Sequence, residues 1–77
     1  MRAVILAPEM EQFKNREYLL EFLQVGRYVK VSAVDPITNV EVSIVGDAAA
    51  TKAELQRVAV GKLEYVLRKK LAQNARP

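Results

Sequence analysis

Two segments of the chain alternate between apolar and polar residues with a period of two, which is the pattern of a β-strand that buries one face. They are residues 27–35, RYVKVSAVD, and residues 40–45, VEVSIV. Between them lies DPITN, in which Pro36 presets its backbone angle, Asp35 can accept a hydrogen bond within the turn, and Asn39 tolerates a left-handed conformation. The pattern predicts a β-hairpin closed by this loop.

Residues 17–25, EYLLEFLQV, are apolar on both sides and fit two structures. One is a helix that starts near Pro8 and ends at Gly26, because proline is common at helix starts and glycine just after helix ends. The other is a strand, which is favoured because residues 27–35 need a pairing partner and Gly26 can turn the chain between them. As a strand, it holds Tyr18, Leu20 and Phe22 on one face and Leu19, Leu23 and Val25 on the other.

The C-terminal third of the chain has the period of an amphipathic α-helix. Thr51 followed by Glu54 is a capping box, in which each side chain pairs with a backbone N–H left free at a helix start. The predicted helix runs from about Lys52 to about Leu71. At about 100° per residue its apolar side chains cover roughly 240°, about twice the stripe of an ordinary surface helix. A sheet on one side leaves part of this surface to be covered by something else.

These elements predict an α+β fold, a three-stranded antiparallel meander followed by a C-terminal helix packed on one face of the sheet. Residues 16–77 are expected to form this single β-β-β-α domain. Residues 1–15 fit it least well, because Pro8 interrupts a short apolar run and the residues that follow are mainly polar. They are expected to form a loosely ordered N-terminal arm or one short helix.

Composition limits both how so short a chain can be stable and which chemistry it can perform. It has 77 residues, with no cysteine and no histidine. Disulfides and thiolate–imidazole zinc sites are therefore excluded, which leaves oligomerisation or unusually tight packing as the means of stabilisation. The same absences exclude Ser-His and Cys-His nucleophile pairs and imidazole bases. No enzymatic activity, cofactor or metal is expected.

Neither end of the chain predicts export or membrane insertion. The segment MRAVILAP has an apolar run shorter than the roughly 7 to 15 residues of a secretory signal, and no stretch approaches the roughly 20 apolar residues of a membrane span. A cytoplasmic protein with no membrane partner is expected. Residues 51–77 hold seven Lys and Arg against two Asp and Glu, so the basic excess lies in the predicted helix and tail.

Four segments, EYLLEF, YVKVSAVDP, EVSIVG and ELQRVAVGKLEYVL, resemble a family of short bacterial proteins described only as a domain of unknown function. The resemblance covers about residues 16–70 and depends most on EVSIVG and KLEYVL at this separation, joined by a link rich in Thr and Ala. It implies a compact strand-rich sheet with a C-terminal helix and no established activity. Residues 1–15 lie outside it.

A second resemblance is one of topology. If residues 1–15 are helical, the order helix, three strands, helix is similar to a double-stranded RNA-binding domain, which contacts phosphates from the start of its last helix. Here that start reads TKAELQR, in which Glu54 interrupts the basic residues. Nucleic-acid binding is the alternative function, through a cationic set made of Lys52, Arg57, Arg68, Lys69 and Lys70.

The leading expectation is a non-enzymatic, self-associating protein-interaction module. The helix offers more apolar surface than one sheet covers, residues 17–25 are apolar on both faces, and most soluble homo-oligomers are two-fold dimers. The partner is therefore expected to be a second copy of the chain. Two surfaces are candidates, one on the strand and one on the helix, and their contributors are Tyr18, Leu20, Phe22, Val60, Leu67 and Leu71.

Overall fold

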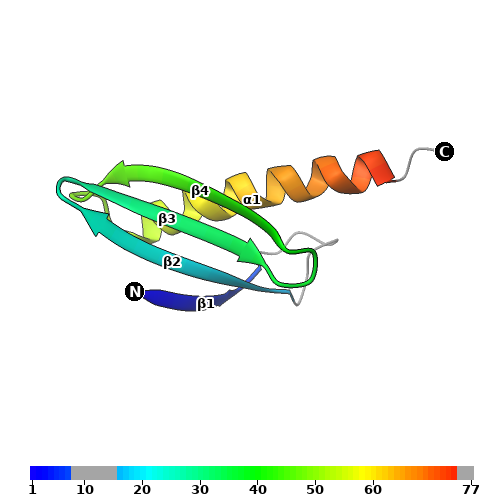
Figure 1. Cartoon of the computed structure of the whole chain (residues 1–77), viewed down its shortest axis with the longest axis horizontal. Helices are drawn as coiled ribbons and strands as arrows, with labels where there is room; N and C mark the ends of the chain where they lie inside the picture. The colour runs from blue at the N-terminus through cyan, green and yellow to red at the C-terminus, as the bar shows by residue number, and fades with distance from the viewer. Residues whose placement is uncertain (8–15, 75–77) are drawn as a thin grey trace.

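The computed structural model describes residues 1–7 and 16–74, which form a four-stranded antiparallel sheet with a helix against it (Figure 1). The elements are β1 (Arg2–Leu6), β2 (Glu17–Val25), β3 (Tyr28–Asp35), β4 (Val40–Asp47) and α1 (Lys52–Asn74). Strands that follow one another in the chain are neighbours in the sheet. The α+β class, the antiparallel meander and the C-terminal helix are confirmed. Residues 17–25 are a strand, so the helical alternative for them is wrong.

The sheet has a fourth strand that the sequence did not predict. Residues 2–6, expected to belong to an arm or a short helix, form β1 and pair with β2 along their whole length. Ala3 and Ile5 of this strand pack against the core. The run RAVIL is too short to show a period, and it becomes a strand because the edge of β2 offers unpaired backbone groups. The remainder of the expected arm, residues 8–15, lies outside the described residues.

The two hairpin connections have the backbone conformations that their residues favour. Gly26 begins the two-residue turn between β2 and β3 with φ of 60°, a left-handed value that glycine adopts without strain at this turn position. Asn39 ends the loop between β3 and β4, also with φ of 60°. In that loop Asp35 Oδ1 accepts a hydrogen bond from the backbone N–H of Ile37 (3.3 Å). The predicted hairpin loop is confirmed.

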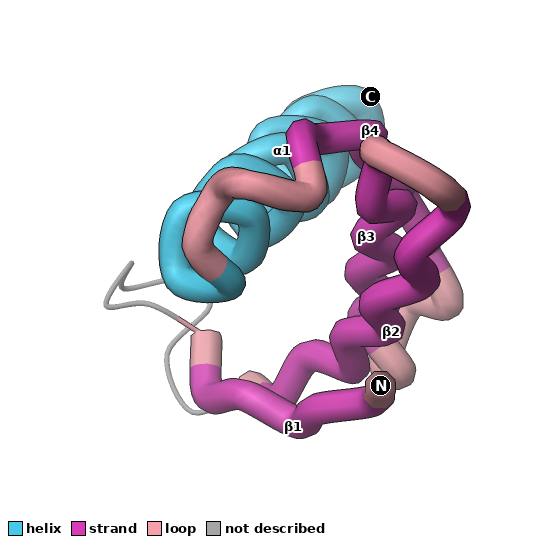
Figure 2. Tube along the Cα trace, turned by 90° about the vertical axis from the view of Figure 1, so that its left-hand side faces the viewer, coloured by secondary structure: helices cyan, strands magenta, loops and turns pink. Residues whose placement is uncertain are grey.

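Helix α1 starts at the predicted capping box. Thr51 Oγ1 accepts a hydrogen bond from the backbone N–H of Glu54 (3.1 Å), and the Thr51 hydroxyl donates to Glu54 Oε1 (3.0 Å). The helix lies over β3 and β4, and the sheet curves around it so that β1 and β4 lie on either side (Figure 2). This curvature gives the helix more cover than a flat sheet provides.

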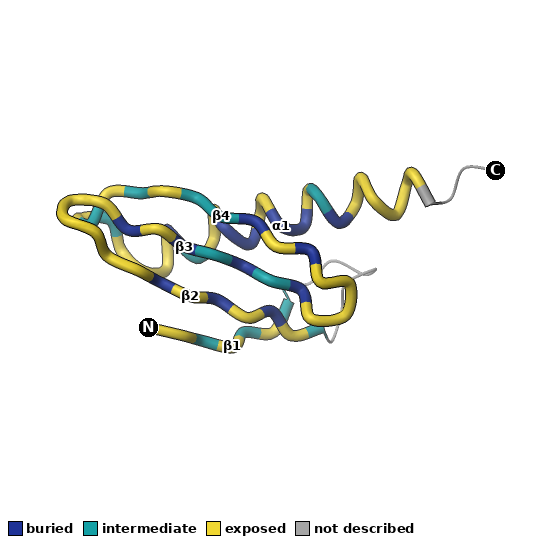
Figure 3. Tube along the Cα trace, in the orientation of Figure 1, coloured by how far each residue is buried: buried dark blue, intermediate teal, exposed yellow. Residues whose placement is uncertain are grey.

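A single core fills the space between α1 and the inner face of the sheet. Buried and exposed residues alternate along the strands, and one side of the helix is buried (Figure 3). The core side chains are Tyr18, Leu20, Phe22, Val29, Val31, Ala33, Val40, Val42, Leu55, Ala59, Val60, Leu63 and Leu67. A Cβ atom added at Gly46 would collide with Cδ2 of Leu55, so glycine lets β4 approach the helix closely at this point.

The broad apolar surface of α1 is mostly covered by the chain's own sheet. Val60 and Leu67, at the side of the helix, are as buried as Leu63 at its centre. Three large apolar side chains of the helix remain about half exposed, namely Val58, Tyr65 and Leu71. The helix by itself therefore leaves few large apolar side chains in contact with solvent.

Candidate functional site

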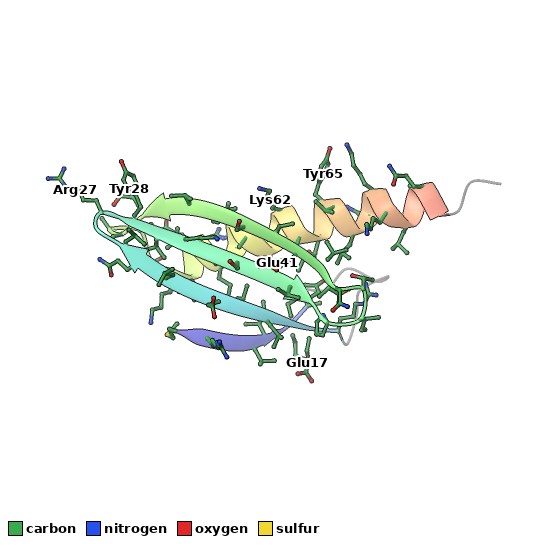
Figure 4. The ribbon with its side chains drawn as sticks, in the orientation of Figure 1. Glu17, Arg27, Tyr28, Glu41, Lys62 and Tyr65 are labelled. Atoms are coloured by element: carbon green, nitrogen blue, oxygen red, sulfur yellow. The ribbon has the colours of Figure 1, made fainter. Side chains whose placement is uncertain are left out.

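The face of the sheet that points away from α1 is covered by no described element, and we call it the open face. Figure 4 looks onto this face, with Glu41 pointing from it. Because successive side chains of a strand point to opposite sides, the strand residues that are not directed to the core belong to it. They are Arg2, Val4, Leu6, Glu17, Leu19, Glu21, Leu23, Val25, Tyr28, Lys30, Ser32, Val34, Glu41, Ser43, Val45 and Asp47.

The register of the strands arranges these side chains in rows across the sheet. The apolar row consists of Val4, Leu19 and Val34 and ends at Glu41 on β4. The polar row, one step further along the strands, consists of Arg2, Glu21, Ser32 and Ser43. Beyond it lie two mixed rows, which contain Leu23, Lys30 and Val45 and then Val25, Tyr28 and Asp47. The open face therefore has two apolar areas separated by a polar strip.

A shallow hollow of about 410 Å³ lies at the apolar row. Its charged lining includes Arg2 and Glu21, which form an ion pair across β1 and β2 with Nε 3.0 Å from Oε2, and Glu41 from β4. The pair is exposed to solvent, so its contribution to stability is small. An apolar floor with charged side chains around it has the chemistry of a protein contact surface.

The large apolar side chains of the open face are well exposed. Seven of them are between 45% and 71% exposed, and these are Val4, Leu6, Leu19, Leu23, Val25, Tyr28 and Val45. Single exposed apolar residues are common on soluble proteins, but a set gathered on one face of one sheet marks an interaction site. The open face is therefore the candidate functional surface.

The residues predicted to form an interface lie mostly inside the chain. Tyr18, Leu20 and Phe22 face α1, and Val60 and Leu67 face the sheet, so all five are buried in the chain's own core. Leu71 alone is exposed among the six. The structure thus leaves these five side chains unavailable at the surface and presents the other face of β2 to solvent.

The turn between β2 and β3 holds the signal that distinguishes the two faces of β2. A two-residue turn at Gly26 and Arg27 pairs Val25 with Tyr28, and Leu23 with Lys30. Directly opposed residues share a face, so the apolar residues Leu23 and Val25 must lie on the polar face of β3. The core face of β2 then follows from the pattern of β3.

The cationic set does not form one surface. At about 100° per residue, Arg57 and Arg68 project from one side of α1, Lys69 from another, and Lys52 and Lys70 from a third. All five side chains are exposed. Lys69 Nζ lies 5.0 Å from the centre of the Tyr65 ring, a cation–π contact within the helix.

Two buried polar groups pair between the sheet and the helix. The hydroxyl of Tyr18 on β2, fully buried, donates a hydrogen bond to Glu64 Oε2 on α1 (3.1 Å). Burial raises the pKa of Tyr18 well above its ordinary value, and the hydrogen bond and negative charge of Glu64 raise it further. Sequence reasoning missed this pair, because Glu64 belongs to the polar side of an ideal helix and is buried only by the curvature of the sheet.

This pair predicts a loss of stability at alkaline pH. The folded chain keeps the Tyr18 proton, whereas the unfolded chain releases it near a pKa of about 10. The stabilisation is complete below pH 10 and decreases as pH rises above it, because proton release then favours unfolding. Urea melts between pH 8 and pH 11 should show a decline that Tyr18→Phe makes shallower and that Tyr28→Phe, at an exposed tyrosine, leaves unchanged. Equal slopes for all three proteins would contradict the prediction.

A family model matches residues 15–70, which include β2, β3, β4 and most of α1. The chain belongs to the family described as Domain of unknown function (DUF6898). The predicted family resemblance is confirmed, while the bacterial origin stays a prediction. Strand β1 lies outside the matched residues. The chain matches no curated protein and no solved structure.

Two other kinds of feature, a metal site and a membrane-spanning helix, have no counterpart among the described residues. Among residues 1–7 and 16–74, no three His, Cys, Asp or Glu side chains gather closely enough to hold a metal ion. Within that same part of the chain, α1 carries too many charges to serve as a membrane-spanning helix. The open face is thus the feature that needs a functional account.

Proposed function

We propose that the chain is a non-enzymatic, self-associating protein-interaction module and that the open face is its contact surface. One observation carries the proposal. Seven large apolar side chains are exposed together on one face of a sheet whose other face is already the core. An antiparallel sheet with one face in water normally alternates between apolar and polar residues, and β2 does not.

A second copy is the partner that the chain's own properties favour. Below roughly 80 residues one core provides little stability, and this chain has no cysteine with which to add a disulfide. Association of two open faces removes apolar surface from water on both chains at once. A two-fold dimer needs only one such patch, because each copy presents the same surface to the other. A cytoplasmic location is part of this proposal.

Sedimentation equilibrium at micromolar concentration tests self-association directly. We expect the mass of a dimer for the unaltered chain and on the order of tenfold weaker association for Leu19→Lys, which places a charge in the apolar row. A monomer mass for the unaltered chain, with an intact circular dichroism spectrum, would overturn the proposal.

Leu71→Lys is a matched control. Leu71 and Leu19 are both leucines that are 45% exposed, but Leu71 lies near the end of α1 and Leu19 on the open face. The same substitution at Leu71 should leave the dimer mass unchanged. A dimer that Leu71→Lys weakens and Leu19→Lys does not would assign the contact to the helix.

Nucleic-acid binding along α1 is a second candidate. It is favoured by the distal part of the helix, where Arg68, Lys69 and Lys70 are exposed next to the exposed ring of Tyr65. Cations bind phosphates and aromatic rings stack on bases. Binding of labelled duplex RNA that weakens steeply with salt, and that charge reversal at Lys69 and Lys70 abolishes, would support this function. Binding that is absent at low salt would eliminate it.

A further inference from the structure

The charges on the open face alternate in sign from strand to strand. β1 carries Arg2, β2 carries Glu17 and Glu21, β3 carries Lys30, and β4 carries Glu41 and Asp47. Each strand therefore presents a single sign on this face, in the order positive, negative, positive, negative. Glu17 and Asp47 lie near opposite ends of the face. The four charged side chains nearer its middle are two cations and two carboxylates, namely Arg2, Lys30, Glu21 and Glu41.

This alternation distinguishes two ways of placing one open face on another. In the first, the two-fold axis lies between the sheets and runs perpendicular to the strands. Each strand then lies over the same strand of the second chain, so charges of the same sign oppose one another. A two-fold axis that runs along the strands, between β2 and β3, lays β1 over β4 and β2 over β3. Each strand then opposes a strand of the other sign. Complementary charges fix the register of an interface, and opposed like charges disfavour it.

We infer, on the basis of the proposed function, that two copies pack open face to open face with β2 of each lying over β3 of the other. Packed sheets keep their strand directions within about 30°, which this axis allows. Arg2 of each copy then lies diagonally across from Glu41 of the other, one row away along the strands, and Glu21 lies diagonally across from Lys30 in the same way.

The same arrangement matches the rows of the face. An axis along the strands preserves position along them, so each row meets itself. Leu19 then lies over Val34 of the second copy, and Val4 lies over Glu41. The polar row meets the polar row, which places Glu21 over Ser32, whose hydroxyl can donate to that carboxylate. Leu19 and Val34 are removed from water together, and Glu21 finds a polar partner.

The shape of the sheet suits this pairing. Figure 2 shows the sheet curving around α1, so β1 and β4 fall away from the middle of the open face. The strands at the middle, β2 and β3, carry most of the apolar side chains of the face. The outer strands carry Arg2 and Glu41, long side chains that can span the wider gap. The ion pair of Arg2 with Glu21 in the same chain is solvent-exposed and can rearrange at little cost.

Charge reversal in two separate chains tests the arrangement. In Arg2→Glu dimers, the introduced carboxylate of each copy opposes Glu41 of the other, and in Glu41→Arg dimers the introduced guanidinium opposes Arg2. Each variant alone should dimerise about tenfold more weakly than the unaltered chain at low salt. An equimolar mixture should regain the original dissociation constant, because both contacts in the mixed dimer again join opposite charges. Sedimentation equilibrium of each protein and of the mixture measures this.

The mixture also controls for damage within one chain. Arg2→Glu places a second carboxylate beside Glu21, and mixing cannot repair repulsion inside a chain, so recovery requires a contact between copies. A mixture of Lys30→Glu chains with Glu21→Lys chains is an independent second test. Each variant alone should dimerise more weakly, and the mixture should recover the original dissociation constant. If the unaltered chain dimerises but neither mixture recovers, the arrangement is wrong and the proposed function stands. If the unaltered chain is a monomer, both are wrong.

Discussion

Leu63→Ala should lower the free energy of unfolding by about 2 to 5 kcal/mol, the range for removing a buried leucine side chain. Leu63 is fully buried at the centre of the helix face that packs on the sheet. The substitution removes apolar contact and leaves a cavity that the surrounding strands cannot fill, because their backbones are held by the sheet. Denaturant melts followed by circular dichroism measure the change.

Leu71→Ala serves as the reference for this measurement. It makes the same chemical change on the same helix, but at a side chain that is 45% exposed. We expect a loss below about 1 kcal/mol there, because most of the side chain is already in contact with water. A loss under about 0.5 kcal/mol at Leu63 would mean that α1 packs on the sheet in a different register.

Asp35→Ala should cost about 3 kcal/mol. The carboxylate of Asp35 is fully buried at the end of β3 and holds three groups at once. Oδ1 accepts from the backbone N–H of Ile37 (3.3 Å), Oδ2 accepts from the hydroxyl of Thr38 (2.9 Å), and Arg16 Nη2 lies 3.6 Å from Oδ2. Its removal leaves a part-buried backbone donor and a largely buried cation without this partner.

Asp35→Asn separates the charge from the hydrogen bonds. The amide oxygen can still accept from Ile37, but the ion pair with Arg16 is lost, so we expect about half of the cost of Asp35→Ala. Urea melts of the two variants against the unaltered chain measure both costs. If Asp35→Ala costs less than about 0.5 kcal/mol, the carboxylate does not hold this loop. If the two variants lose the same free energy of unfolding, the ion pair with Arg16 accounts for the whole effect.

Features that depend on a few neighbouring residues were predicted well. The loop DPITN and the turn at Gly26 form as expected. Of the expected capping box, Thr51 accepts from the backbone N–H of Glu54, while Glu54 accepts from the Thr51 hydroxyl rather than from a backbone N–H. Each is a local arrangement, in which a side chain meets a backbone group two or three residues away or a residue tolerates a left-handed φ. The alternating pattern of residues 28–35 predicted a strand for the same reason, since its period is visible within the segment.

Features that depend on distant parts of the chain were not predictable in the same way. Strand β1 exists because the edge of β2, some fifteen residues further along the chain, accepts it. Glu64 is buried because the curved sheet brings Tyr18 to it. Lys62 lies in the apolar arc of the helix, and its amine donates to the carbonyl of Ser43 on the edge strand β4 (2.9 Å). None of these contacts leaves a periodic signal in the sequence.

The sequence by itself determined β3, β4 and α1 with their order and the turns between the strands, favoured a strand for β2, and identified the family to which the chain belongs. The pattern of β2 by itself did not decide which of its faces enters the core; its pairing with β3 in the sheet did. Both of its faces are apolar, so burial of either one satisfies β2 alone. The choice is made by pairing with β3, whose apolar face enters the core. That choice buries Tyr18, Leu20 and Phe22 and leaves Leu19, Leu23 and Val25 on the open face.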